Sequence, residues 1–489
     1  MTMLLNPTSR AAARFAHDED GAGTVFGLFL FMVFVILGGV ALDSSNAWRN
    51  STHLNASADS AAHAGAVALA NGGDLDDVRA MAQAAAVTNM PQQRYGTVVG
   101  NAVNNIQLMH FDTATRELSS TGTLNAVVVD LGQTATNANA VRTYFLRLMG
   151  VNSWDVTGRS IAVYDASAEC NNTDGIYAED EVSLSSQNSV GSGFCVHSQH
   201  AVWLPQQNSF GPGSMVSMPN LADCKSKCTQ SANPGINPMA INMILPDFRD
   251  YIENTYDAFN ASSSALKSAW FSQKGLTGIN WTLNIKPLKD AGVVPKNKSL
   301  DIGSVVTMTW DQFHAMPALP RGLVYNIDCP NNGNSSKTRL TFNATTGVMD
   351  DSALLTDCSI RFDDGAMVLG SLVVTIREQS TATVTSGSKV TVADPTKQCN
   401  NADRTTVMAL GKVSAPAEFV MSNVTLVSDD DVDIASATSS GVVSRGLSIY
   451  ATGKVSLSSQ HTLEVCGGTN LLAPEGKVIR HVMASAANL

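Results

Sequence analysis

The first apolar stretch of the chain lies near its N-terminus and carries no charge. It lies between Asp20 and Asp43 and holds 22 uncharged residues. A helix of this length, at about 1.5 Å per residue, reaches roughly 33 Å and can cross the hydrocarbon core of a bilayer. A cleaved signal peptide is the alternative, but its apolar region is usually shorter and follows net positive charge, whereas His17-Asp18-Glu19-Asp20 precedes this one. We therefore expect a transmembrane anchor over residues 21–43 after a cytoplasmic tail over residues 1–20.

Two alanine-rich segments after the anchor predict helices. Residues 46–70 are dominated by Ala, the strongest helix former, and place small or apolar residues at three- and four-residue steps. Asn71-Gly72-Gly73 predicts the end of this helix, and a second helix is expected from Leu75 to Met90, before Pro91. Small residues on one face suit close packing, either against the helix's own domain or against a partner's helix.

Strand-like patterns follow these helices. Between Tyr95 and Tyr164 there are β-branched runs such as Ala126-Val127-Val128-Val129, which predict strands. One further helix is predicted over residues 140–149. We expect residues 44–166 to form one α+β unit.

The most regular pattern is an internal repeat with a period of 20 residues. Residues 181–200 and 201–220 are identical at eight positions. The same module returns near the C-terminus, where nine of the twelve residues in 449–460 match residues 176–187. Apolar-x-apolar strands also recur there at an offset of 23 residues, as in Val424-x-Leu426 and Leu447-x-Ile449.

Short strands separated by Gly, Asn and Ser turns at this spacing are typical of the coils of a parallel β-helix. A single coil cannot bury its apolar side, so coils must stack. We expect the two arrays, over residues 167–224 and 401–489, to join in one solenoid, with residues 225–400 as an inserted α+β region. The β-like stretches within 225–400 are equally consistent with further coils. For the whole head, the alternative to a solenoid is an antiparallel sandwich. A helix is also predicted within 225–400, from Phe248, Ile252, Tyr256 and Phe259.

Composition and charge narrow the class of function. The 489-residue chain has 31 Lys and Arg against 42 Asp and Glu, for a formal net charge of -11. This balance argues against nucleic acid as a partner, because phosphate binding needs clustered cations. Only 6% of the residues are aromatic and 15% are charged, a mix typical of secreted β-rich scaffolds rather than enzymes.

The even number of cysteines, all beyond residue 169, favours disulfides and therefore an oxidising compartment. Their connectivity cannot be read from the sequence. The candidate disulfide residues are Cys170, Cys195, Cys224, Cys228, Cys329, Cys358, Cys399 and Cys466.

Two segments carry residues that metals prefer. Cys195-x-His197-x-x-His200, with Cys224-x-x-x-Cys228 nearby, is the best zinc candidate, although disulfides are the favoured interpretation. Ser428-Asp429-Asp430-Asp431-Val432-Asp433 offers calcium ligands but lacks the Gly and Glu of the helix-loop-helix calcium site, so a solvated turn is favoured. We predict no metal site and no cofactor.

Candidate catalytic groups are equally sparse. Some β-helix proteins cleave acidic polysaccharides with clustered carboxylates and cations, which draws attention to Asp350-Asp351 and Asp363-Asp364. No cation is grouped with either pair in the sequence, so surface turns are the favoured interpretation. Nucleophile-elbow, zinc-protease and phosphate-loop motifs do not occur. We therefore assign no catalytic residue and do not expect an enzyme.

The N-terminal region follows a distinctive order of motifs. Asp20-Gly21-Ala22-Gly23 precedes the apolar span, Asp43 stands at its outer end, and Leu54-Asn55-Ala56-Ser57-Ala58-Asp59-Ser60-Ala61-Ala62 follows. This order resembles TadG-like proteins of the Flp, or tight-adherence, pilus-assembly system, whose Ala-rich helix carries an N-A-x-D-A-A-A signature. The positions that match the family motif are Gly21, Asp43, Asn55 and Asp59.

Two departures limit what the resemblance implies. Larger TadG-like proteins carry a von Willebrand A domain with an Asp-x-Ser-x-Ser metal site, but Asp43-Ser44-Ser45-Asn46-Ala47 has Ala47 in the place of the second serine. Prepilins carry a Glu five residues after the cleaved Gly, and Phe26 stands there after Gly21. We expect neither that metal site nor processing into a pilin.

The resemblance implies a single-pass protein of the bacterial inner membrane, with the bulk of the chain periplasmic or on the cell surface. It implies a non-catalytic structural or assembly role in a pilus that serves cell adhesion. The membrane, other pilus-assembly proteins and further copies of the chain are the implied partners. The alternative is an extracytoplasmic β-helix that binds or cleaves polysaccharide, which would need exposed aromatic residues aligned along a groove.

Overall fold

The computed structural model of the protein describes residues 20–112, 115–165, 174–276, 283–330, 337–379, 381–387, 390–392, 399–415, 420–435, 443–467 and 470–481. Cys170 and the predicted tail, apart from Asp20, lie outside these described residues. The chain forms two compact units, one of residues 1–164 with 479–489 and the other of residues 165–478. The predicted boundary after residue 166 lies within two residues of this division.

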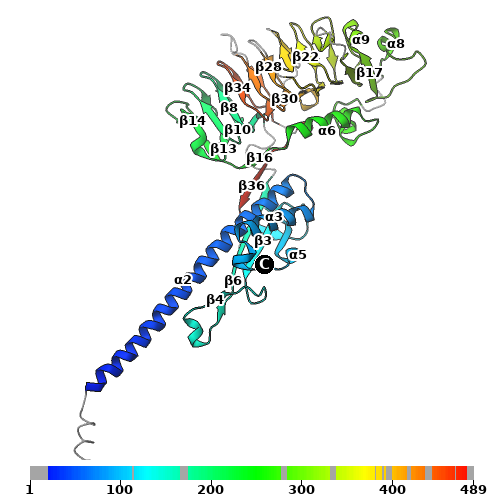
Figure 1. Ribbon diagram of the computed structural model, residues 1–489. Coiled ribbons are helices and arrows are strands. Elements are labelled where there is room, and N and C mark those ends of the chain that lie inside the picture. Colours follow the sequence, from blue (N-terminus) through cyan, green and yellow to red (C-terminus); the bar gives the residue numbers. More distant parts are fainter. Residues whose placement is uncertain are drawn as a thin grey trace, which may run out of the picture. The chain divides into compact units, whose positions relative to one another are not determined.

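The first unit is organised around α2 (Asp20–Ala70), a single helix of 51 residues (Figure 1). The predicted anchor and the predicted Ala-rich helix are one element, because no proline or turn sequence separates them. Most of the large apolar side chains of the predicted span are exposed, and by length and composition this helix could cross a membrane. The helix ends directly before Asn71-Gly72-Gly73, as predicted.

The C-terminal half of α2 packs on its own unit. It contacts α3 (Leu75–Asn89) and β3 (Ala126–Gln133), and its Leu54, Ala58 and Ala61 are fully buried. Of the two packing modes expected for the small-residue face, the structure shows the intramolecular one. The first unit also holds the antiparallel strands β6 (Val156–Asp165), β3, β1 (Ile106–Asp112) and β2 (Glu117–Ser119), and the short helices α4 (Gln92–Tyr95) and α5 (Ala102–Asn105).

The helix predicted over residues 140–149 is wrong. Strand β4 (Val141–Arg142) pairs with β5 (Ser153–Trp154), and a short 3₁₀ helix covers Leu146–Met149. Gly150 follows in a left-handed conformation, at φ 89°, which ends the turn. The apolar spacing in this segment therefore comes from a hairpin, and tertiary contacts override the helical pattern.

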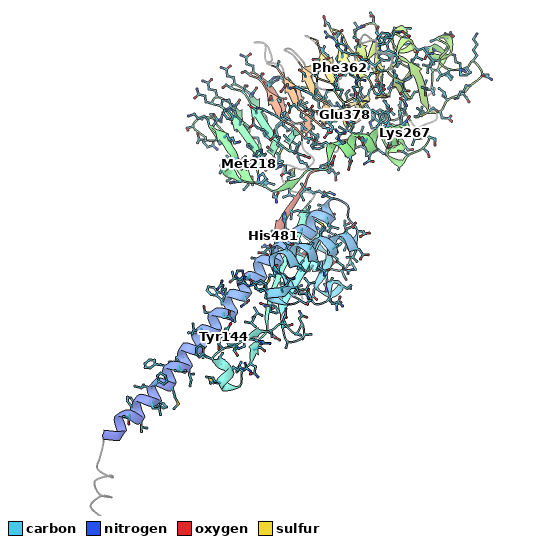
Figure 2. The ribbon with its side chains drawn as sticks, viewed as in Figure 1. Tyr144, Met218, Lys267, Phe362, Glu378 and His481 are labelled. Carbon is cyan, nitrogen blue, oxygen red and sulfur yellow. A yellow bond between two sulfur atoms is a disulfide. The ribbon has the colours of Figure 1, made fainter. Side chains whose placement is uncertain are left out.

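The second unit is a stack of coils, each built from up to three short strands (Figure 1). The strands pair in parallel with those of neighbouring coils and form sheets of eleven, nine and four strands. Inward-facing apolar side chains fill one continuous core, in which Met218 and Phe362, labelled in Figure 2, are 0% and 1% exposed. The predicted parallel β-solenoid head is confirmed.

The strands have the following bounds. The eleven-stranded sheet contains, in spatial order, β15 (Pro238–Ala240), β13 (Met215–Met218), β10 (Cys195–Ser198), β7 (Gly175–Ala178), β33 (Leu447–Ala451), β30 (Val424–Ser428), β27 (Thr405–Ala409), β24 (Leu372–Thr375), β21 (Ala353–Thr356), β18 (Val324–Asp328) and β17 (Val305–Thr309). The nine-stranded sheet contains β14 (Cys224–Ser226), β11 (Ala201–Leu204), β8 (Glu181–Leu184), β34 (Val455–Leu457), β31 (Val432–Ile434), β28 (Val413–Ala415), β25 (Val384–Ser386), β22 (Ser359–Phe362) and β19 (Arg339–Phe342). The four-stranded sheet contains β12 (Ser209–Phe210), β9 (Ser189–Val190), β35 (Thr462–Glu464) and β32 (Val443–Arg445). Parallel pairs are formed by β20 (Met349–Asp350) with β23 (Val368–Leu369) and by β26 (Thr391–Val392) with β29 (Val420–Met421), and β16 (Met243–Ile244) pairs antiparallel with β36 (Lys477–His481).

The spatial order of the coils differs from their order along the chain. The chain enters the solenoid in its middle, at β7, and winds outward to β15. It then passes through α6 (Phe248–Asn260), α7 (Ala265–Gln273) and α8 (Lys286–Asp290), re-enters at the far end at β17, and winds back to β33. There β33 pairs with β7, so the two predicted arrays join in one solenoid, as expected from their shared module.

The region predicted as an insertion contains both an insertion and coils. The strands from β17 to β26 lie in the parallel sheets or in their flanking pairs, so the described part of residues 305–392 forms coils. The described residues outside the coils lie within 241–304, and the helix predicted there is observed as α6. Helices α6 and α7 cover the outer face of the eleven-stranded sheet. The side chains that they bury against it are Phe248, Ile252, Phe259, Trp270 and Phe271. Helix α9 (Trp310–Ala315) follows β17.

An asparagine ladder explains the Gln-Asn-Ser repeat. Asn188, Asn208 and Asn233 are buried at equivalent turns. The backbone N–H of Asn188 donates to Asn208 Oδ1 at 3.0 Å, and that of Asn208 donates to Asn233 Oδ1 at 2.8 Å. The preceding Gln187 and Gln207 have positive φ values of 67° and 72°. The repeat therefore encodes a turn whose amides bind the next coil.

Candidate functional site

Asp43 holds a loop of the first unit against α2. Its Oδ1 accepts a hydrogen bond from the Tyr144 N–H at 2.8 Å, and its Oδ2 accepts from Phe145 at 3.0 Å and Leu146 at 2.8 Å. The residue is 2% exposed. A Cβ atom on Gly39, one turn earlier, would lie 2.4 Å from Phe145 Cβ, so glycine is needed for this close approach. The predicted family residue thus fixes the start of the 3₁₀ helix, as a carboxylate does at a helix N-terminus.

The other family-motif residues lie along the same helix. Gly21 lies in the first turn of α2, and Asn55 and Asp59 are exposed on its C-terminal half. A Cβ atom on Gly158 would lie 3.0 Å from Asn55 Oδ1, which places this side chain beside β6. The motif residues therefore share one helix, and Asp43 is the one with the largest set of tertiary contacts.

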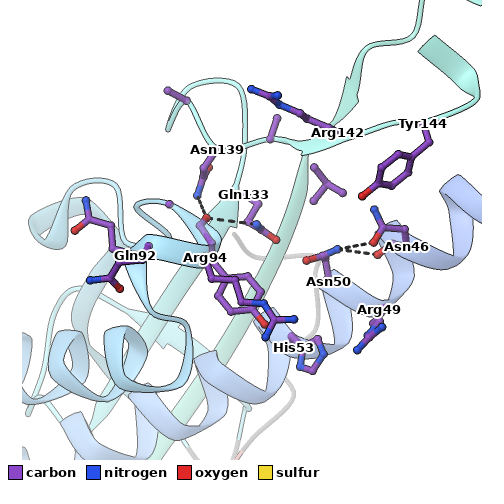
Figure 3. Close-up of a pocket in the computed structure, with 16 residues that line it drawn as sticks. Asn46, Arg49, Asn50, His53, Gln92, Arg94, Gln133, Asn139, Arg142 and Tyr144 are labelled. Atoms are coloured by element: carbon purple, nitrogen blue, oxygen red, sulfur yellow. Dashed lines mark hydrogen bonds between the residues drawn. The ribbon is translucent and has the colours of Figure 1, made fainter. Parts of the chain in front are cut away.

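A polar pocket of about 540 Å³ lies beside α2, in the first unit (Figure 3). Its lining includes three arginines and no carboxylate. Sequence reasoning missed this pocket, because its cations come from three separate segments and no local motif joins them. The polar lining residues include Asn46, Arg49, His53, Arg94, Gln133 and Arg142.

The described cysteines are all disulfide-bonded. Three bonds are described at both ends: Cys224–Cys228, Cys329–Cys358 and Cys399–Cys466. Cys195 is also disulfide-bonded. The zinc candidate therefore loses its thiolates, since only a reduced cysteine is a zinc ligand.

The two histidines of the zinc candidate lie in different environments. His197 is fully buried on β10, where its Nδ1 and Ser217 Oγ are 2.8 Å apart. His200 is exposed, and its Nδ1 lies 3.2 Å from Asp180 Oδ1. Among the described residues, the one cluster with metal-ligand spacing is Cys329, Asp357 and Cys358, and both of its cysteines are oxidised.

The buried histidine predicts a loss of stability in acid. Burial lowers the pKa of His197 to about 3, below the ordinary value of 6.5. The unfolded chain therefore takes up this proton first, so the stabilisation is complete above pH 6.5 and is lost as the pH falls toward 3. We expect this group to lower the free energy of unfolding by about 3 kcal/mol between pH 7.5 and pH 4.

The measurement is the free energy of unfolding of the detergent-extracted full chain at several pH values. His197→Gln is expected to flatten the pH dependence by the stated amount. His200→Gln, which changes an exposed histidine three residues away, is the matched control. Equal pH profiles for the wild type and His197→Gln would contradict the assignment.

The calcium candidate is a turn between β30 and β31, as favoured. Asp429 pairs with Arg249 Nη2 at 2.7 Å, and Asp433 pairs with Lys412 Nζ at 2.5 Å. Asp431 Oδ1 accepts a hydrogen bond from the Lys454 N–H at 2.8 Å. These carboxylates are thus compensated by cations and a backbone amide of the chain itself.

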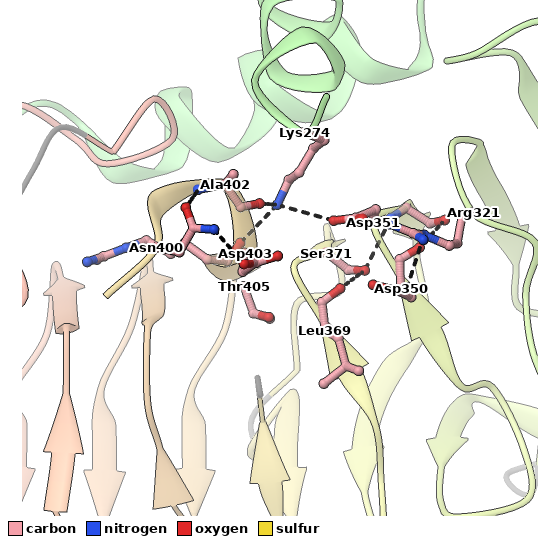
Figure 4. A network of polar contacts seen from close by, with 12 residues as sticks. Lys274, Arg321, Asp350, Asp351, Leu369, Ser371, Asn400, Ala402, Asp403 and Thr405 are labelled. Carbon is pink, nitrogen blue, oxygen red and sulfur yellow. Dashed lines mark hydrogen bonds and ion pairs between the residues drawn. The ribbon is translucent and has the colours of Figure 1, made fainter. Parts of the chain in front are cut away.

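The interpretation of Asp350-Asp351 as a surface turn without cations is wrong. Asp351 is 5% exposed and pairs with Arg321, whose Nε also lies 3.1 Å from Asp350 Oδ2 (Figure 4). Lys274, from the segment after α7, lies 3.8 Å from Asp351 Oδ1 and donates to the carbonyl oxygen of Ala402. Asp363 likewise pairs with Arg361 at 2.5 Å. For Asp351 the fold supplies both cations from distant segments, whereas Arg361 lies only two residues before Asp363 in the sequence.

The central cation of this network is buried and paired within the chain. The Lys274 side chain is 2% exposed, and its ammonium group already has protein partners. Lys274 directly follows α7, and its partners Asp351 and Ala402 belong to the coils, so the network joins α7 to the coils. Separating them would leave a buried charge unpaired, which is costly.

The nine-stranded sheet presents a polar outer face. Trp203 on β11 is 45% exposed, and the register places it beside Ser183. The row continues through Ser456, Asp433, Ser414, Thr385, Arg361 and Thr341. Trp203 is the one aromatic residue of this described row, so the row lacks the aligned aromatics that the polysaccharide alternative needs.

Comparison with known proteins gives two family matches. Residues 21–68 match the Flp pilus-assembly TadE/G-like family model, which confirms the resemblance of the N-terminal region and associates the chain with Flp pilus assembly. This match and the apolar helix fit a membrane-anchored protein. No curated protein and no solved structure matches the chain. Residues 175–467, more than half of the chain, match the model of a domain of unknown function, DUF7867, and the protein therefore belongs to the DUF7867 family.

Proposed function

We propose that the protein is a membrane-anchored, extracytoplasmic structural or assembly protein of the Flp pilus system, and that it works without catalysis. The observation that carries the proposal is the TadE/G-like match over residues 21–68, which covers the apolar half of α2 and Asp43. The disulfides support an oxidising compartment. We infer the bacterial inner membrane as the site of the anchor, with the head in the periplasm or at the cell surface.

The solenoid architecture of the head supports a role in binding partner proteins. A solenoid offers a long, regular surface because every coil repeats the same strand positions. The polar outer face of the nine-stranded sheet, from Thr341 to Trp203, is one such surface. Other pilus-assembly proteins are the proposed partners, and further copies of the chain are a second class.

The proposed function requires the membrane anchor, and this requirement can be tested by removing the span. Residues 21–42 are replaced by a cleavable signal peptide and Asp43 is kept, so that the head is exported but not held in the membrane. We expect the protein to appear in the soluble extracytoplasmic fraction and pili to be lost, because assembly takes place at the membrane. The readouts are cell fractionation and counting of pili by electron microscopy.

The matched control replaces the span between Asp20 and Asp43 by an unrelated apolar span of equal length and keeps both aspartates. This variant is expected to stay in the membrane and to support piliation. Normal piliation by the unanchored protein would contradict the proposal. Depolymerisation of an acidic polysaccharide by the purified protein would contradict its non-catalytic part.

A further inference from the structure

We propose that the polar pocket beside α2 binds the phosphoglycerol headgroup of an anionic membrane lipid. The ligand chemistry is a phosphate group together with hydroxyl groups, and the bilayer is its source. The inference rests on the membrane anchoring proposed above. It adds a specific ligand site that neither the anchor nor the solenoid requires.

The charge of the pocket selects an anion. Arg49, Arg94 and Arg142 line it, with His53 and several amides, and no carboxylate does. Among the described residues, none of these three arginines pairs with a carboxylate, although the whole chain carries a net charge of -11. The planar guanidinium group binds phosphate oxygens in pairs, which makes arginine the preferred phosphate ligand.

A buried amide at the back of the pocket selects hydroxyl groups. Gln133 is 6% exposed, and its Nε2 donates to the Tyr95 carbonyl oxygen at 3.4 Å. Its Oε1 has no hydrogen-bond partner among the described residues, and in Figure 3 it is turned toward Asn50. A buried acceptor without a donor is costly, so a ligand O–H at this place would be favoured. A glycerol headgroup carries such hydroxyls next to its phosphate.

The position of the pocket along α2 matches the headgroup layer. Asn46 and Arg49 follow Asp43 by three and six residues, which is about 4 to 9 Å along a helix. The polar layer on each side of a bilayer is about 5 to 8 Å deep. With Asp43 at the outer end of the span, Asn46 lies within this layer and Arg49 lies at its outer edge.

The loop that Asp43 holds also indicates that the pocket lies at the membrane interface. Its large apolar or aromatic side chains are exposed, with Tyr144 at 72% and Leu148 at 82%. Trp48, next to Arg49 on α2, is 76% exposed. Exposed aromatic and apolar residues at the end of a span are typical of the membrane interface. The pocket therefore opens where lipid headgroups are the most abundant phosphate source.

The test measures lipid retention by the purified full chain. The protein is extracted in detergent, incubated with equal amounts of phosphatidylglycerol and phosphatidylcholine, and analysed by native mass spectrometry. We expect a preference for phosphatidylglycerol of at least about tenfold. Arg49→Gln with Arg94→Gln should remove most of this preference. In a second incubation, with phosphatidylglycerol and phosphatidic acid, the wild type is expected to prefer phosphatidylglycerol, because phosphatidic acid lacks the headgroup hydroxyls, and Gln133→Leu should remove this second preference.

Arg147→Gln is the matched control, because Arg147 belongs to the loop near Asp43 but does not line the pocket. An equal loss in this variant would overturn the pocket in favour of general surface charge. Displacement of phosphatidylglycerol by soluble glycerol phosphate would overturn the lipid source, and equal retention of both lipids would overturn the site. These readouts use purified protein and do not depend on piliation, so this inference and the proposed function fail separately.

Discussion

Replacing Asp174 by alanine is expected to lower the free energy of unfolding of the head by about 3–5 kcal/mol, the cost of breaking a buried ion pair. Asp174 Oδ1 lies 2.7 Å from Arg404 Nη2, and both side chains are 3% exposed. Its Oδ2 accepts hydrogen bonds from the Cys466 N–H at 2.6 Å and the Gly467 N–H at 3.2 Å. Alanine would leave a buried guanidinium and two amides without their acceptor.

The pair lies at the junction of the two arrays. Asp174 directly precedes β7, and Arg404 precedes β27, on the opposite side of β33 in the sheet. Denaturant unfolding of the detergent-extracted full chain, followed by tryptophan fluorescence, measures the loss. Asp180→Ala removes an exposed carboxylate six residues away and is expected to cost less than about 1 kcal/mol. Equal effects of the two substitutions would show that the junction does not depend on the ion pair.

Removing the Cys399–Cys466 disulfide is expected to lower the free energy of unfolding by about 4 kcal/mol. The bond closes a loop with a sequence separation of 67 residues. Without it the unfolded chain gains loop entropy, which grows with the length of the closed loop. The variant is Cys399→Ser with Cys466→Ser, measured by the same denaturant unfolding under non-reducing conditions.

The chain contains a natural control for this effect. Cys224–Cys228 has a sequence separation of 4, so its removal is expected to cost only about 2 kcal/mol. A larger loss from the short loop would contradict the entropic explanation. Because Asp174 binds the Cys466 amide, the two junction effects share contacts and are not expected to add in a combined variant.

Local patterns predicted the individual elements well. The Ala-rich stretches, the Gly and Asn stop signals and the steps from Phe248 to Phe259 correspond to α2, α3 and α6. The predicted strand pairs also stack at the offset read from the sequence, as Val424 opposite Leu447 shows. Such patterns are local because each coil or helix repeats the same inside and outside positions. The segment 140–149 misled this approach, since Asp43 and β5 hold it as a hairpin.

Candidate sites were less predictable than elements. Asp43 was identified through the family motif, and its role as a cap became visible only with Tyr144 and Phe145 beside it. The pocket arginines and the cations around Asp351 come from separate segments, so no window of sequence contains them together. The cysteines indicated an oxidised head, but their pairing depends on which coils are neighbours.

The sequence by itself therefore determined that this protein has an apolar span and an Ala-rich helix of TadG-like type, followed by a head of stacked β-coils. The sequence also indicated that the two arrays join, but only the tertiary structure decided which coils are neighbours and that the chain enters the solenoid in its middle, at β7. Contacts such as Asp174 with Arg404, 230 residues apart, decide this order. The physical reason is that coils built on one repeat present equivalent strand edges. The repeat alone therefore cannot decide which coil stacks on which. The neighbouring coil is selected by side chains that occur in one coil only. Asp174 and Arg404 are such a pair, and they meet only when the two arrays lie together.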